Sequence, residues 1–233
     1  AIHWINRPTF QQVVQTGSTD AWSCHASRVA DTVVAGASLA IDGELGPTML
    51  QVGKPKSVCG VAEVNGGGVR NEGAHLACYK AKTTKGQPRH RPAGGTLASS
   101  FANGRVSLSP INSICLGAVV DGGSSAVRAD GRECFRARLQ DSSTQDAEVA
   151  VTDASGQRRM KVLRLDSVCL PVATPAGEIV DTSGELACFR TRRASGEPRF
   201  PGRDVVVETQ LGVETHTLRR DDRVCVAARV TLD

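Results

Sequence analysis

The segment Cys78-Tyr79-Lys80-Ala81-Lys82 returns 110 residues later as Cys188-Phe189-Arg190-Thr191-Arg192. Ser57-Val58-Cys59 returns at the same distance as Ser167-Val168-Cys169. A shift of 110 also carries each of the first four cysteines onto one of the last four. The eight cysteines are Cys24, Cys59, Cys78, Cys115, Cys134, Cys169, Cys188 and Cys225. The chain is therefore a tandem duplication.

Each half divides again into two related units. Successive cysteines are separated by 35, 19, 37, 19, 35, 19 and 37 residues, so every unit spans 54 to 56 residues and carries two cysteines. A period of this length is typical of stacked or beaded repeats. We therefore predict an N-terminal arm at 1–19, a first domain at 20–129 and a second domain at 130–233, each domain being built from two repeats.

Strand signals dominate the chain. Short alternating runs lie at 105–108, 148–152 and 204–208, and further strands are expected to carry the cysteines, as at 75–80 and 164–170. Five Asn-Gly or Asp-Gly pairs supply tight turns, and no stretch shows a helical period. The sequence predicts an all-β fold, in which each domain is a disulfide-stapled, β-sandwich-like structure.

The alternation of a strand predicts which side chains share a face. It places Leu76 and Cys78 on one face and Tyr79 on the other. The residue after the first cysteine is aromatic in three units, Tyr79, Phe135 and Phe189, which predicts one core aromatic per unit. His25 stands at this place in the first unit, which indicates that this unit packs differently.

The cysteines are expected to form disulfides. Their number is even, their spacing is regular, and no C-x-x-C pair occurs, which argues against zinc or haem. Pairing across the 19-residue gaps gives three bonds and leaves Cys24 to meet Cys225. Pairing across the longer gaps closes every unit, and we favour it because an array grown by duplication contains whole units. The favoured bonds are Cys24–Cys59, Cys78–Cys115, Cys134–Cys169 and Cys188–Cys225.

The compartment follows from the disulfides, which persist outside the cytoplasm. The chain starts at Ala1 without an apolar signal run, as a processed secreted protein does. No window of about 18 apolar residues predicts a membrane span. We expect a secreted protein, extracellular or at the cell surface.

Basic residues cluster at matching places in the two halves, although the net charge is only +4. The candidates for binding a polyanion are Lys80, Lys82, Arg89, Arg190, Arg192 and Arg193. One interpretation is an anion-binding strip in each domain. The other is a pair of solvated hairpin edges, whose charges prevent edge-to-edge pairing.

The N-terminal arm has no copy in the second half. Its apolar residues are Ile2, Trp4, Ile5 and Phe10. The arm can fold back onto its own domain, or it can add as a strand to a neighbouring subunit. The second alternative predicts self-association into a homopolymer.

The motifs His75-Leu76-Ala77-Cys78-Tyr79-Lys80 and Ser167-Val168-Cys169-Leu170-Pro171-Val172 give the chain a resemblance to known proteins. It resembles a loosely defined, largely uncharacterised family of secreted bacterial repeat proteins with H-L-x-C-Y-x-x-K … L-C-x-P units. The first unit lacks the aromatic, and only the third keeps Cys-Leu-Pro. The resemblance implies an extracellular or cell-surface β-repeat protein, and it carries no catalytic residues to transfer.

Catalytic motifs are missing from the sequence. It contains no G-x-S-x-G, H-E-x-x-H or phosphate-binding loop, and Asp221-Asp222 is expected to lie in a turn. We therefore predict no enzyme activity, no cofactor, no metal and no nucleic-acid partner. The expected function is a structural subunit of an extracellular filament or surface assembly, docked through the arm. The alternative is a secreted adhesion module that binds an anionic polymer or glycan.

Overall fold

The computed structural model describes residues 20–92, 94–123, 129–140, 147–180 and 184–233. These residues form twelve β-strands and no helix, so the predicted all-β fold is confirmed. The strands are β1 (Ala21–Arg28), β2 (Ser38–Gly43), β3 (Thr48–Val64), β4 (His75–Thr83), β5 (Gly94–Ser99), β6 (Asn103–Val120), β7 (Gly131–Leu139), β8 (Glu148–Asp153), β9 (Gly156–Ala173), β10 (Leu186–Arg193), β11 (Arg203–Thr209) and β12 (Gly212–Leu232).

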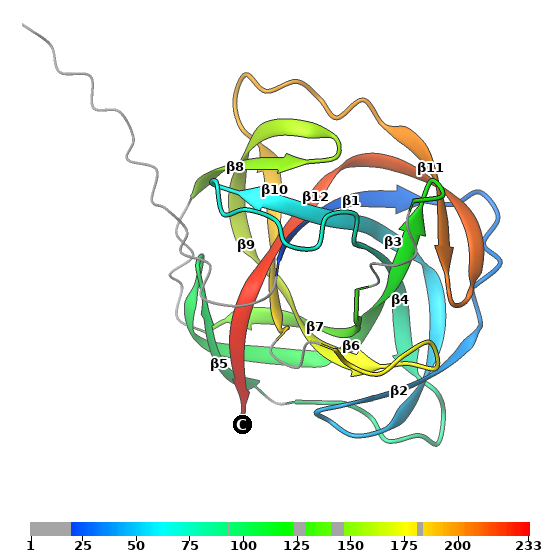
Figure 1. The fold of residues 1–233 in the computed structure, drawn as a ribbon. Helices are drawn as coiled ribbons and strands as arrows, with labels where there is room; N and C mark the ends of the chain where they lie inside the picture. The colour runs from blue at the N-terminus through cyan, green and yellow to red at the C-terminus, as the bar shows by residue number, and fades with distance from the viewer. Residues whose placement is uncertain (1–19, 93, 124–128, 141–146, 181–183) are drawn as a thin grey trace, which may run out of the picture.

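Four units of three strands repeat along the chain: β1–β3, β4–β6, β7–β9 and β10–β12. Within each unit the first strand pairs with the second half of the long third strand. The long strand then pairs with the first strand of the next unit. Because β12 also pairs with β1, eight strands close into an antiparallel barrel. Figure 1 looks through the ring that these strands form.

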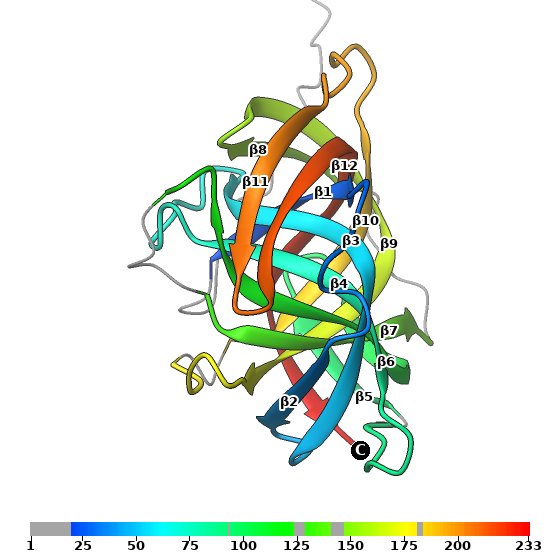
Figure 2. The same ribbon diagram turned by 90° about the vertical axis from the view of Figure 1, so that its right-hand side faces the viewer.

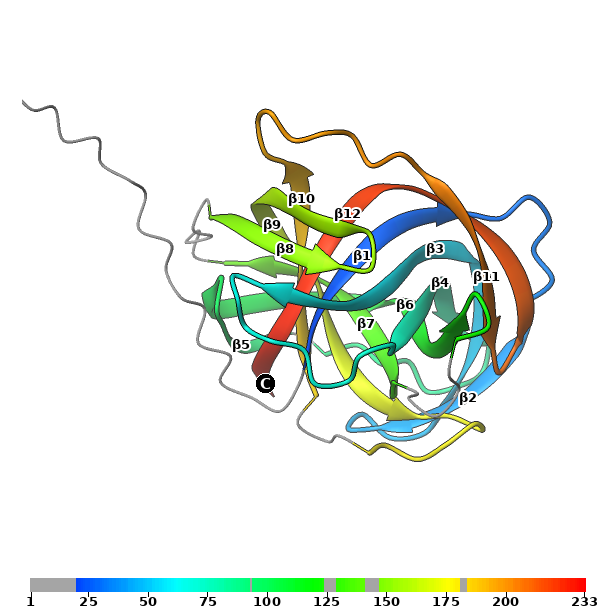
Figure 3. The same cartoon turned by 45° about the horizontal axis from the view of Figure 1, so that its top comes forward.

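The remaining strands, β2, β5, β8 and β11, lie outside the barrel (Figure 2). Each forms a hairpin with the first half of its unit's long strand. Each also pairs with the long strand two units away: β2 with β9, β5 with β12, β8 with β3, and β11 with β6. Figure 3 shows β8 beside the end of β3. Units one and three therefore hold each other, as do units two and four.

The two halves of the chain combine differently from the expected pair of sandwich-like domains. The pairings of β2, β5, β8 and β11 with the long strand two units away all join a unit in 20–129 to a unit in 130–233, and one apolar cluster runs through both halves. The physical reason is that each half contributes four barrel strands with two open edges. These edges are satisfied only when β6 meets β7 and β12 meets β1.

The inside of the barrel is filled by disulfides. The four bonds are those of the long-gap scheme, and each joins residues directly opposite on neighbouring strands. All eight cysteines line one cavity of about 10 Å³, which must lie inside the barrel because it touches all eight barrel strands. Sulfurs of successive bonds are 3.8 Å apart at Cys115 and Cys134, and 4.0 Å apart at Cys169 and Cys188. The barrel thus has a sulfur core.

The outer face of the barrel carries a second, larger core. Tyr79, Phe135 and Phe189 are at most 1% exposed and pack in the apolar cluster beneath the hairpins. Leu76 and Cys78 belong to the inner cluster instead. The predicted alternation of side chains between the two faces of the strand is therefore correct. In each of these three units the aromatic side chain packs between the barrel and the hairpins that cover it.

A polar layer lies next to the sulfur core. The residues two positions before the second cysteine of each unit are Ser57, Ser113, Ser167 and Arg223, and all are buried. Arg223 Nη2 donates to Ser57 Oγ at 2.7 Å. This layer connects the inside of the barrel to the charged residues described below.

Residues 130–233 expressed alone are predicted not to form a folded monomer, because β7 and β12 would each lose a barrel partner. We expect an unfolded chain or a dimer in which two halves rebuild the ring. Size-exclusion chromatography with light scattering and urea unfolding of the oxidised fragment measure this. A monomeric fragment with a cooperative transition would show that the halves are independent domains.

Candidate functional site

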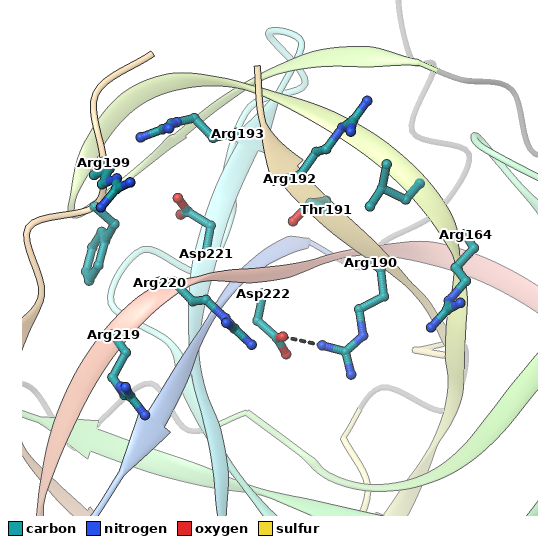
Figure 4. A pocket seen from close by; sticks show the side chains of 12 residues that line it. Arg164, Arg190, Thr191, Arg192, Arg193, Arg199, Arg219, Arg220, Asp221 and Asp222 are labelled. Atoms are coloured by element: carbon teal, nitrogen blue, oxygen red, sulfur yellow. Dashed lines mark hydrogen bonds and ion pairs between the residues drawn. The ribbon is translucent and has the colours of Figure 1, made fainter. Parts of the chain in front are cut away.

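A pocket of about 920 Å³ opens between β9, β10, β12 and the segment that follows β10 (Figure 4). Its volume is in the range of ligand sites. It is lined by Leu163, Arg164, Arg190, Thr191, Arg192, Arg193, Arg199, Phe200, Arg219, Arg220, Asp221 and Asp222. Seven of these twelve lining residues are arginines, so the lining is strongly cationic.

Most of these arginines form no ion pair with the residues that the structure describes. The six exposed ones are Arg164, Arg192, Arg193, Arg199, Arg219 and Arg220. No ion pair joins any of these six to a carboxylate in the part of the chain that the structure describes. Like charges gathered in this way repel one another, and a bound anion would relieve that repulsion.

The seventh arginine is already neutralised. Arg190 donates from Nε to Asp166 at 2.9 Å and also pairs with Asp222, as the dashed line in Figure 4 shows. Arg223 Nε lies 3.0 Å from Asp222, which links this cluster to the polar layer of the barrel. Burial opposes ionisation of Asp166, but the charges of Arg223 and Arg190 outweigh it and hold its pKa below the usual range. These pairs fix the floor of the pocket.

Asp221, the second carboxylate of the pocket, is paired with an arginine that does not line the pocket. Arg158 donates from Nε to Asp221 at 2.7 Å and from Nη2 to Asp153 at 2.7 Å. His25 lies 3.5 Å from the carboxylates of Asp153 and Asp221. Its ring stacks on Phe200 at a centroid distance of 4.4 Å. Burial would raise the pKa of Asp153, but hydrogen bonds from Arg158 and His25 hold it far below normal. Both carboxylates of the pocket are thus engaged.

The arrangement therefore presents cationic hydrogen-bond donors, since its carboxylates are already paired. Guanidinium groups present planar, paired donors that match sulfate, phosphate and carboxylate oxygens. Leu163 and Phe200 add apolar surface among the cations. The pocket can hold an acidic ligand that has an apolar face.

Half of the predicted polyanion-binding residues come together here. Arg190, Arg192 and Arg193 lie at the end of β10 and line the pocket. Lys80 and Lys82 lie on β4 and are exposed, as is Arg89, but none of the three lines it. The prediction of two equivalent strips therefore does not describe this pocket, which is built from units three and four, with Asp221 held against His25 of unit one.

Sequence reasoning missed Arg164, Arg219 and Arg220. The prediction that Asp221-Asp222 forms a turn was wrong, because both residues lie within β12 and Asp222 is buried against arginines. The sequence signal that could have pointed to this pocket was His25, which stands where the other units carry an aromatic residue. Its ring stacks on Phe200, which lines the pocket.

The predicted docking arm, with Ile2, Trp4, Ile5 and Phe10, lies outside the described residues. Its docking to another subunit stays a prediction. Within the described ranges, no helix is long and apolar enough to cross a membrane.

Two other buried histidine–carboxylate pairs lie among the described residues, and neither pair lines this pocket. His90 Nδ1 lies 2.7 Å from Glu133 Oε2, and burial raises the pKa of this fully buried carboxyl. Glu214 lies beside His216 and accepts hydrogen bonds from Thr32 Oγ1 and the Val33 amide. Both pairs tie segments of the chain together, which is a structural role.

Comparisons with protein families, with curated proteins and with solved structures found no match to this chain. The resemblance to secreted bacterial repeat proteins therefore rests on the short motifs alone, and function must be argued from the site.

Lys56 is predicted to titrate near pH 8. Burial and the nearby Arg223 charge together lower its pKa to about 8, although the Asp166 charge opposes the shift. An unfolded lysine has a pKa of about 10.4. Between about pH 8 and about pH 10.4 the folded state therefore binds fewer protons than the unfolded state. The free energy of unfolding should rise as the pH increases through this window. NMR of ¹³C-methylated lysines measures the pKa. Asp166→Asn should lower it further, and a midpoint at 10 or above would contradict the burial.

Proposed function

We propose that this protein is a secreted, non-catalytic module that binds an acidic ligand in the arginine pocket. The observation that supports the proposal is the convergence of six exposed arginines, without carboxylate partners among the described residues, on one hollow. Like charges gathered in one place repel one another, so the stability of the fold gives no reason to gather these arginines. An anion that contacts several of them would gain both charge neutralisation and paired hydrogen bonds.

The scaffold favours binding that depends on fixed geometry. Arg164, Arg192 and Arg219 project from three neighbouring barrel strands whose register is set by the disulfide ring. Rigid elements place binding groups more accurately than loops do. The disulfides also support a secreted protein, since such bonds persist outside the cytoplasm.

The filament function expected from the sequence remains a second proposal, which depends on the arm at 1–19. No observation on the described residues favours it over binding. A filament function and ligand binding are compatible, because each subunit of a surface assembly can hold an acidic glycan in its own pocket.

Neutralising the pocket is predicted to abolish binding of a short acidic probe. A heparin tetrasaccharide should bind the wild-type protein with an affinity that falls as salt rises. The variant Arg192→Gln, Arg193→Gln, Arg219→Gln should bind it at least about tenfold more weakly, since each charge-assisted hydrogen bond contributes about 1.5 kcal/mol or more. Isothermal titration calorimetry at two salt concentrations measures both effects.

The matched control removes the same charge elsewhere. Lys80→Gln, Lys82→Gln, Arg89→Gln also lowers the net charge by three, on exposed positions that do not line the pocket. This control should keep close to wild-type affinity. Equal losses in both variants would show that general charge, not the pocket, attracts the probe, and no binding by the wild type would refute the proposal.

A further inference from the structure

A second arginine-lined hollow adjoins the pocket. It has a volume of about 420 Å³ and is lined by Arg136, Ala137, Arg138, Leu139, Arg164, Leu165, Asp166 and Arg190. Arg164 and Arg190 belong to both hollows, so the two share a wall. The basic surface therefore continues beyond the site proposed above.

The charges of the second hollow repeat the pattern of the first. Arg136 and Arg138 are exposed, and the structure shows no ion pair for either within its described ranges. The hollow's carboxylate, Asp166, is engaged by Arg190 at 2.9 Å and by Arg223 at 3.3 Å. Here too the carboxylate is already paired, whereas Arg136 and Arg138 face solvent without an ion-pair partner among the described residues.

The strand order turns the two hollows into a track. Arg136 and Arg138 lie on β7, Arg164 on β9, Arg192 on β10 and Arg219 on β12. These four strands are successive neighbours in the barrel. Since neighbouring strands lie about 4.8 Å apart, the track extends over up to roughly 14 Å. A single sulfate or phosphate cannot reach across it, whereas a chain of sugars can.

The crossing point between the hollows is suited to a chain that passes over it. Arg190 is held down by Asp166 and Asp222, so it adds little net charge there. Arg164 is exposed and unpaired among the described residues, and it belongs to both hollows. A ligand crossing at this point would meet one free cation at the wall and clusters of cations on either side.

The lining distinguishes sugars from nucleic acid. Single-stranded nucleic acids require aromatic platforms on which successive bases stack. Among the described residues, Phe200 is the only aromatic one that lines either hollow, and its ring is already stacked on His25. One partly exposed ring beside arginines fits the apolar face of a sugar, but it does not provide a series of platforms.

We propose that both hollows form one track for an extended acidic polysaccharide, which lies across Arg164 with acidic groups in each hollow. This inference rests on the proposed function and adds the class and extent of the ligand. Linking two sets of contacts in one chain raises the affinity beyond that of either hollow.

Heparin oligosaccharides of two, four, eight and twelve sugars test the inference by calorimetry. Wild-type affinity should rise by at least about tenfold from the disaccharide to the dodecasaccharide, because the longer chain engages both hollows. In Arg136→Gln, Arg138→Gln this gain should fall to a few-fold increase, which arises because a longer chain offers more positions at which it can bind. The disaccharide affinity of this variant should match that of the wild type.

The control Lys80→Gln, Lys82→Gln removes two charges outside both hollows and should keep the full gain. If the gain survives in Arg136→Gln, Arg138→Gln, the track is refuted, while tetrasaccharide binding still supports the pocket. If the tetrasaccharide does not bind at all, the proposed function itself fails. A single-stranded oligonucleotide of equal charge should bind at least about tenfold more weakly than the dodecasaccharide, and equal or tighter binding would overturn the assignment to a polysaccharide.

Discussion

The packing of four disulfides inside one barrel is the constraint on which the rest of the structure depends. Each of the eight barrel strands supplies one cysteine, and all eight line a single small cavity. A slip of one residue in any strand would turn its cysteine to the outer face and break a bond. The ring therefore fixes the register of every barrel strand at once. It also fills a lumen that is too narrow for large side chains from all eight strands.

The outer layer follows from that register. With the cysteines inside, the next residue points outward, which places Tyr79, Phe135 and Phe189 beneath the hairpins. Each hairpin then pairs with the long strand two units away, so the barrel is wrapped by contacts between the two halves. A protein with few aromatic residues thus gains two cores, one of sulfur and one of aliphatic and aromatic side chains.

The candidate site is an asymmetry on this nearly four-fold scaffold. Three positions before the second cysteine, the units carry Lys56, Asn112, Asp166 and Asp222. Two positions after the first cysteine they carry Ala26, Lys80, Arg136 and Arg190. Only units three and four combine an acid at the first of these positions with an arginine at the second. Asp166 and Asp222 pair with Arg190, while the other arginines of the pocket face solvent. Function is placed on such a scaffold by side chains, not by the fold.

The sequence by itself determined the four units, the strands that carry the cysteines, the favoured bonds and the faces of Leu76, Cys78 and Tyr79. These follow from spacing and alternation, which are local properties of a chain. It also pointed to Arg190, Arg192 and Arg193. Tertiary structure alone decided that the units close one barrel instead of two domains, because edge pairing between β12 and β1 depends on how the chain ends meet in space. It alone brought Arg164, Arg199, Arg219 and Arg220 to the same pocket, since residues from different strands become neighbours only through the register of the sheet.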